Sequence, residues 1–185
     1  MRTERLTLRP WDPDSDEDVR IAFDIYRRPA VAQWLSQPAK PWTSESAARE
    51  RLQRWAKVGV DRPGYGLWAV VPDDVRYPVG TVLLVPLPGR GGVLTDDIEI
   101  GWHLHPDHWG HGYATEAARA VLSHAFSDLR LPVVNAVAFE GNDASMAVMR
   151  RLGMSHQGTT DHWYATRFEW WTVERDSEAR TPAGQ

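Results

Sequence analysis

The chain has 185 residues, of which 42% are hydrophobic and 25% charged, and its formal net charge is −4. These values are typical of one soluble globular domain with a sizeable core, and they give no reason to expect nucleic-acid binding. The sequence contains no cysteine, which excludes disulfides and thiolate metal sites and makes the cytoplasm the expected compartment. The polar start, MRTERLTLRPW, predicts neither a signal peptide nor a membrane anchor.

The first quarter of the chain predicts one strand and two helices. Alternating leucines in ERLTLRPW indicate the strand, and an acidic stretch at residues 14–18 precedes a helical spacing of apolar residues. Thr43 or Ser44 is expected to cap the second helix, which Gly59 closes.

The middle of the chain predicts three strands. GLWAVVP and PVGTVLLVPLP form an expected hairpin, and DDIEIGWHLH alternates cleanly between apolar and polar residues. Asp97, Glu99 and His103 then share one face, unless a bulge at Gly101 resets the register. The opposite, apolar face comprises Ile98, Ile100, Trp102 and Leu104.

The last third opens with the strongest helical pattern, in which apolar residues recur at helical spacing from Ala114 to Leu129. The run PVVNAVAF predicts a buried central strand. Asn142 or Asp143 starts a short helix that Gly153 ends, and MSHQGTTDHWYATRFEWWTV predicts a closing hairpin.

The order of these elements predicts an α/β (α+β) domain in which helices pack on a mixed sheet. Residues 1–175 are expected to form this single domain, with neither internal repeat nor interdomain linker. Residues 176–185 are polar, and we expect them to be disordered.

Residues 103–108 have the His-x-His-x-Asp-His spacing that resembles the metal-binding loop of metallo-β-lactamase-type hydrolases. Neutral imidazoles and a carboxylate are suitable ligands for two zinc ions that activate a water. That family also needs a late final histidine, and no histidine follows His162 to supply it. A zinc loop has no need of two glycines that lead directly into a long helix. We therefore expect no metal, and treat a di-zinc hydrolase as the weakest alternative.

The stretch WGHGYATEA, directly after this run, has the properties of a pyrophosphate-binding loop. Gly110 and Gly112 remove side chains where an anion must approach the main chain. The amides of residues 110–115 then lie at a helix N-terminus, where the helix dipole favours negative charge.

This stretch resembles the acetyl-CoA loop of the GNAT N-acetyltransferases, Gln/Arg-x-x-Gly-x-Gly/Ala, with Gly112 and Ala114 at its last two fixed positions. It is most similar to the branch that acetylates the N-terminal amines of ribosomal proteins. Trp109 stands where most members carry Gln or Arg, so the side-chain contact of those members does not carry over, whereas the backbone amides are unaffected. NDASMAVMRRLGM resembles the Asn-x-x-Ser…Leu-Gly-Phe segment of the same family, and both chain ends also match the branch.

The resemblance implies the GNAT fold, a mixed and mostly antiparallel sheet of six to seven strands, flanked by about four helices and splayed at an acetyl-CoA cleft. It implies acetyl-CoA as co-substrate and direct acetyl transfer to an amine. The residues it assigns to cofactor binding are His103, Leu104, His105, Trp109, Gly110, His111, Gly112, Tyr113, Ala114, Thr115 and Asn142.

Two residues are the catalytic candidates. Glu99 is the first choice for the general base, ahead of Asp97 and His103, although an exposed strand residue without a role fits the pattern too. Ser145 is expected to donate a proton to the leaving thiolate, because Met149 occupies the position where many members carry a tyrosine. A serine that only caps its helix is the alternative for Ser145.

The acceptor amine belongs either to a protein N-terminus or to a small molecule, and the sequence does not distinguish them. We expect it near Trp34, Trp42, Tyr65 and the loop 87–95. The alternative from another class is a non-catalytic acyl-CoA-binding or sensor domain. A monomer and a homodimer both remain open, and no membrane or nucleic-acid partner is expected.

Overall fold

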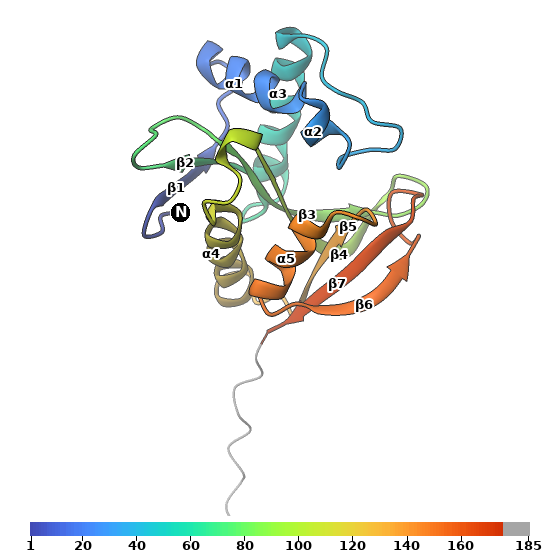
Figure 1. Cartoon of the computed structure of the whole chain (residues 1–185). Helices are drawn as coiled ribbons and strands as arrows, with labels where there is room; N and C mark the ends of the chain where they lie inside the picture. The colour runs from blue at the N-terminus through green and yellow to red at the C-terminus, as the bar shows by residue number, and fades with distance from the viewer. Residues whose placement is uncertain (176–185) are drawn as a thin grey trace, which may run out of the picture.

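A computed structural model describes residues 1–175, so the predicted disordered tail lies outside the described residues. The described chain forms one seven-stranded sheet in the order β1-β2-β3-β4-β5-β7-β6 (Figure 1). All neighbouring strands are antiparallel except β4 and β5, which are parallel. The strands are β1 (Leu6–Pro10), β2 (Gly66–Pro72), β3 (Gly80–Pro88), β4 (Leu94–Leu104), β5 (Val133–Ala138), β6 (Ser155–Thr160) and β7 (Phe168–Glu174).

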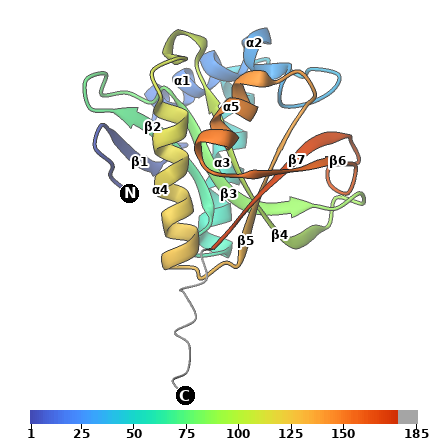
Figure 2. The same cartoon turned by 60° about the horizontal axis from the view of Figure 1, so that its bottom comes forward.

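Helices cover both faces of the sheet. In Figure 2, α4 lies in front of the sheet and α3 lies behind it. The α-helices are α1 (Asp16–Tyr26), α2 (Pro29–Ala32), α3 (Glu45–Asp61), α4 (Tyr113–Ser127) and α5 (Asp143–Arg151), and a short 3-10 turn, η1 (Pro106–His108), follows β4. Within residues 1–175, no helix has the length and apolar character that a membrane crossing requires.

Two apolar clusters hold these layers together, one on each face. The larger packs α4 and α5 against the sheet and includes Ile98 and Ile100 of β4. The smaller packs α1 and α3 on the other face, around Trp11, Tyr26 and Leu52. Each fully buried large side chain contributes about 1.5–3 kcal/mol to folding. Because side chains alternate along a strand, Glu99 and His103 lie on the face covered by α1 and α3.

The predicted strands and long helices are confirmed, as is the register without a bulge at Gly101, and two features differ. Gly59 does not close its helix: α3 continues to Asp61, because an exposed glycine weakens a helix by only about 1 kcal/mol and does not stop it. Gly101 forms no bulge, since β4 pairs with β3 without a break from Ile98 to Leu104. The short helix α2 was not predicted, and its four residues carry too little periodicity to reveal it.

Candidate active site

Strands β4 and β5 separate at one point. Glu99 of β4 and Asn135 of β5 are the single residue pair that joins these two strands, whereas β4 stays paired with β3 as far as Leu104. Asn135 is 4% exposed; its Nδ2 donates to the Ile98 carbonyl (3.2 Å), and its Oδ1 accepts from the Trp170 indole (2.9 Å). These side-chain bonds take the place of backbone pairing, so both strands continue past this point without bonding each other.

The loop between β4 and α4 presents unpaired backbone amides. Gly110 and Gly112 both have φ of +81°, a left-handed conformation that side chains rarely adopt, and Gly112 is the N-cap of α4. A Cβ at Gly110 would meet open space. Glycine is therefore favoured there by the backbone angle and not by crowding. Among the described residues, the amides of 110–115 donate no hydrogen bond. These amides and the positive end of the α4 dipole together favour an anion.

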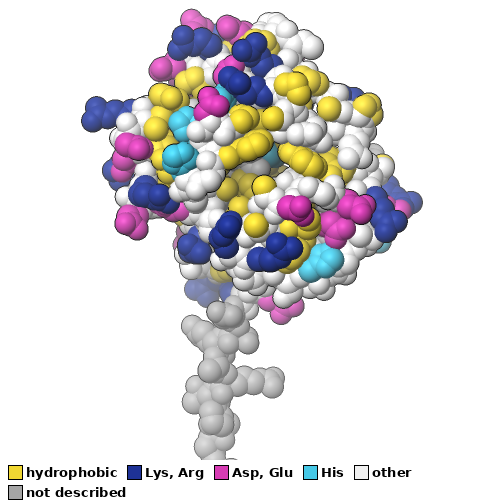
Figure 3. Space-filling view, viewed as in Figure 1, with side chains coloured by type: hydrophobic (Ala, Val, Ile, Leu, Met, Phe, Trp, Pro, Cys, Tyr) yellow, Lys and Arg dark blue, Asp and Glu magenta, His cyan; other side chains and the backbone are white. Residues whose placement is uncertain are grey.

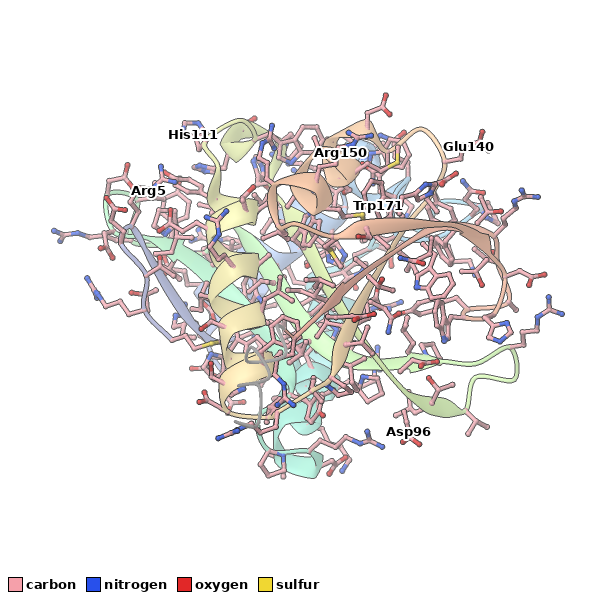
Figure 4. The ribbon with its side chains drawn as sticks, turned by 90° about the horizontal axis from the view of Figure 1, so that it is seen from below. Arg5, Asp96, His111, Glu140, Arg150 and Trp171 are labelled. Carbon is pink, nitrogen blue, oxygen red and sulfur yellow. The ribbon has the colours of Figure 1, made fainter. Side chains whose placement is uncertain are left out.

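Arg5 and Glu116 fasten this loop to the first strand. The Glu116 carboxylate accepts from the Thr3 hydroxyl (2.6 Å), the Arg5 amide (2.9 Å) and Arg5 Nε (2.7 Å). Arg5 Nη1 also donates to the His111 carbonyl (3.2 Å), and its guanidinium lies 5.3 Å from the Tyr113 ring centroid. Figure 4 shows Arg5 and His111 at the same end of α4. Partial burial opposes ionisation of Glu116, yet the bonds from Thr3 and Arg5 hold its pKa below the usual value.

Sequence reasoning missed this contact, because Arg5 and Glu116 lie 111 positions apart and neither local pattern indicates that the two segments meet. Arg5 brings a guanidinium to the loop, where Trp109 lacks the usual polar side chain. The Trp109 indole instead folds back and donates to the Leu104 carbonyl at 2.9 Å. It closes the turn after β4, and the backbone of the loop stays free.

Two histidines of residues 103–108, His103 and His105, are bonded to separate partners. His103 Nδ1 lies 3.3 Å from the Tyr26 hydroxyl, and His105 Nε2 lies 3.1 Å from Asp24 Oδ2. His105 Nδ1 accepts from the Asp107 amide (3.2 Å), which identifies Nε2 as the protonated nitrogen. Residues 1–175 bring together no group of three or more His, Asp or Glu side chains that could hold a metal ion.

Glu99 is the buried carboxylate where the strands separate. It is 9% exposed, and its Oε2 accepts from the Tyr164 hydroxyl at 2.6 Å. Burial raises the Glu99 pKa to about 7, and the bond from Tyr164 partly offsets that rise. Asp97 is exposed and accepts from the Trp163 indole (3.0 Å), while burial lowers the His103 pKa to about 4. Of Glu99 and His103, Glu99 therefore has the pKa closer to neutrality, which suits a general base.

Helix α5 begins beside the end of β5 and carries the second candidate. Asn142 is its N-cap, and its Oδ1 accepts from the Ser145 amide at 3.2 Å. The alternative in which Ser145 caps the helix is therefore wrong. The Ser145 hydroxyl is partly buried and bonds no other group among residues 1–175, so it is available to donate. Met149 is 2% exposed and packs in the core.

The aromatic residues expected around the acceptor divide between the two faces. The Trp42 ring stacks on Tyr26 with centroids 4.4 Å apart, on the face that also carries Glu99. Tyr65 packs against the α4 cluster, on the opposite face of the sheet from Trp42. The space-filling view of the α5 side is hollowed at its centre, with hydrophobic side chains around the hollow (Figure 3).

Comparison with known proteins identifies relatives of this arrangement. The family described as "Acetyltransferase (GNAT) domain" matches residues 5–155. An FsC-acetyl coenzyme A-N(2)-transacetylase of Aspergillus fumigatus is 29% identical over 200 residues, which cover 98% of this chain and 82% of the relative. The uncharacterized protein YkkB of Bacillus subtilis is 34% identical over 173 residues, covering 87% of this chain and 88% of the relative.

Solved structures share the fold. RimL, a ribosomal L7/L12 alpha-N-protein acetyltransferase solved with coenzyme A, superposes with a TM-score of 0.74 at 17% identity over 95% of this chain and 97% of its own. A GNAT-family acetyltransferase from Bacillus anthracis gives a TM-score of 0.74 at 20% identity over 95% of this chain and 98% of its own. At these identities the likeness establishes the fold alone.

Proposed function

The chain belongs to the GNAT family of N-acetyltransferases, and on that premise we propose that it transfers acetyl from acetyl-CoA directly to a primary amine in a ternary complex. The observation that carries the proposal is the row of unpaired amides at residues 110–115, next to the point where β4 and β5 separate. These amides suit a pyrophosphate, and the unpaired edge of β4 suits an amide-bearing chain such as pantetheine.

The cofactor-binding roles follow from these positions. The backbone of residues 110–115 would hold the pyrophosphate. The Leu104 amide, on the side of β4 that faces away from β3, would bind the pantetheine arm. The His105 amide donates to the Val79 carbonyl (2.8 Å), so the main chain of His103 and His105 faces β3 and lies beside the arm without bonding it. Asn142 would contribute through Nδ2, because its Oδ1 is used by the helix cap. No metal takes part in this scheme.

Glu99 would act as the general base. An amine attacks only in its neutral form, and free amines with a pKa near 8–10 are largely protonated at pH 7. With its pKa raised to about 7, the Glu99 carboxylate can accept a proton from the amine, directly or through water, near neutral pH. As the new C–N bond forms and the thioester C–S bond breaks, Glu99 keeps this proton, and the second proton that the attacking nitrogen loses passes to the departing sulfur.

Ser145 would serve the leaving group. Acetyl-CoA supplies the acetyl group as a thioester, so its departing sulfur carries negative charge. The Ser145 hydroxyl can donate a hydrogen bond to it and relay to it the proton that the attacking nitrogen loses, and Met149 offers no donor. A backbone amide on the free edge of β4 would polarise the thioester carbonyl.

The acceptor is proposed only as a class: the amine of a peptide N-terminus or of a small molecule. The name of RimL gives a protein alpha-amine as acceptor and that of the Aspergillus relative gives an N(2) position, and membership of the family fits either class of amine.

The test is release of free thiol from acetyl-CoA with a panel of N-terminal peptides and small amines. We expect at least one amine to be acetylated and Glu99→Gln to slow that reaction by about 10²–10⁴-fold. Stabilisation by acetyl-CoA without thiol release for any amine would contradict the proposal and favour a sensor domain. Stabilisation by zinc but not acetyl-CoA would contradict both.

A further inference from the structure

The loop between β6 and β7 is fastened across the face that carries Glu99. The Tyr164 amide donates to the Pro88 carbonyl (3.0 Å), and Trp163 pairs with Gly89 in an isolated bridge. The Trp163 indole also bonds Asp97 (3.0 Å), and Arg90 forms an ion pair with Asp161. The loop is thus held by several contacts that do not involve the Tyr164 side chain.

The backbone at Tyr164 is unusual. Tyr164 and the next residue, Ala165, have φ of +57° and +51°, in the left-handed region that residues other than glycine rarely enter. Such strain persists only where surrounding contacts impose it, and it is concentrated at functional sites. Here the strained turn directs the Tyr164 hydroxyl to Glu99 Oε2 at 2.6 Å, and the ring packs edge-on against Phe168 with centroids 5.8 Å apart.

The two oxygens of Glu99 differ in their surroundings. Oε2 is bonded by Tyr164, whereas Oε1 receives no hydrogen bond from residues 1–175 and is not among the enclosed polar atoms that lack a partner. Oε1 is therefore the oxygen that remains accessible.

We propose that Tyr164 is a positioning residue that holds the Glu99 carboxylate by Oε2 and leaves Oε1 to accept the proton of the acceptor amine. This inference rests on the proposed base role of Glu99. It adds a residue from the β6–β7 loop that no sequence motif of the cofactor site contains.

The groups around Glu99 make Tyr164 its main electrostatic neighbour. On the two neighbouring strands, Glu99 is paired with Val85 of β3 and Asn135 of β5, and neither side chain is ionisable. On its own strand, Asp97 is engaged by the Trp163 indole and His103 by the Tyr26 hydroxyl. The bond from Tyr164 stabilises the charged form of Glu99 and lowers its pKa, against the larger effect of burial.

The experiment compares Tyr164→Phe with a matched control, Tyr77→Phe. Tyr77 is 45% exposed, and its hydroxyl makes no hydrogen bond to any residue from 1 to 175. Two measurements are made on each full-length variant: the ¹³C NMR titration of the Glu99 carboxyl, assigned with Glu99→Gln, and the pH profile of kcat/KM for one acceptor amine. The ionisation of the acceptor amine is the same for all variants, so it cancels when the kcat/KM of a variant is divided by that of the wild type.

We expect Tyr164→Phe to move the Glu99 titration upward by about 1 pH unit or more, since a bond to a charged group is lost. At pH 7 the ionised fraction then falls from about one half to about one tenth, and kcat/KM falls about fivefold. The deficit should shrink at pH 9, and Tyr77→Phe should match the wild type.

An unshifted titration in Tyr164→Phe, or a rate loss that is equal at all pH values, would overturn the positioning role. A failure of the proposed role of Glu99 as general base can be distinguished from a failure of the positioning role of Tyr164. If Glu99→Gln keeps the wild-type rate, the base assignment fails, while the NMR titration still reports whether Tyr164 controls the carboxylate.

Discussion

Replacing Gly112 by aspartate tests whether the loop backbone binds the cofactor. Gly112 has φ of +81° and ψ of 2°, and a residue with a side chain pays about 1–2 kcal/mol in that region. A Cβ there would lie 3.4 Å from Arg5 Nη2, the movable end of a long side chain, so crowding adds little. The new carboxylate would repel a bound phosphate by about 1 kcal/mol in water and about 4 kcal/mol at a partly shielded surface. The strain acts on the free protein and on the complex alike, so the repulsion sets the loss of affinity: at least about 1 kcal/mol, or about a fivefold weaker complex.

Isothermal titration with acetyl-CoA measures this loss, and two variants separate its causes. Gly112→Asn has nearly the same shape without the charge and tolerates the left-handed conformation, so it should bind at least about fivefold more tightly than Gly112→Asp. Gly110→Ala has the same φ and open space around its Cβ, so it reports backbone strain alone. The difference between Asp and Asn should decrease in high salt. Equal affinities for the wild type and Gly112→Asp, with an intact far-UV spectrum, would refute the reasoning.

Further predictions concern the base, the loop anchor, the acid and the histidines. Because the Glu99 pKa of about 7 exceeds its usual 4.5, ionised Glu99 destabilises the fold, and stability declines as pH rises from about 4.5 to 7. Glu99→Gln should therefore raise the free energy of unfolding at pH 8 by about 2–3 kcal/mol and have little effect at pH 4, which urea titration at both pH values checks. Arg5→Ala should raise the KM for acetyl-CoA about two- to fivefold with little change in kcat; a normal KM would show that the loop needs no anchor. Ser145→Ala should lower kcat more than KM in steady-state assays, and an unchanged kcat would remove its acid role. His108→Ala should change acetyl-CoA binding less than twofold, because its imidazole lies outside the row of free amides.

Local pattern alone determined much of this protein. Period-two alternation predicted the faces of β4, and helical spacing predicted α4 and its buried side, because both depend only on nearest neighbours along the chain. The glycines at 110 and 112 predicted the left-handed turn before α4 for the same reason: their backbone angles are a local property. Gly59 misled the prediction of a helix end, since propensity is weak against the packing of the flanking turns.

The site itself was decided by tertiary structure. The Arg5–Glu116 anchor, the Asn135 side-chain bridge and the Tyr164–Glu99 bond all join residues far apart in the sequence, so no spacing rule reveals them. The chemistry of Glu99 is the clearest case. Its position on a polar strand face was readable from the sequence, but its burial beneath the β6–β7 loop was not. That burial is what raises its pKa to about 7, because a charge loses its hydration when distant segments close around it.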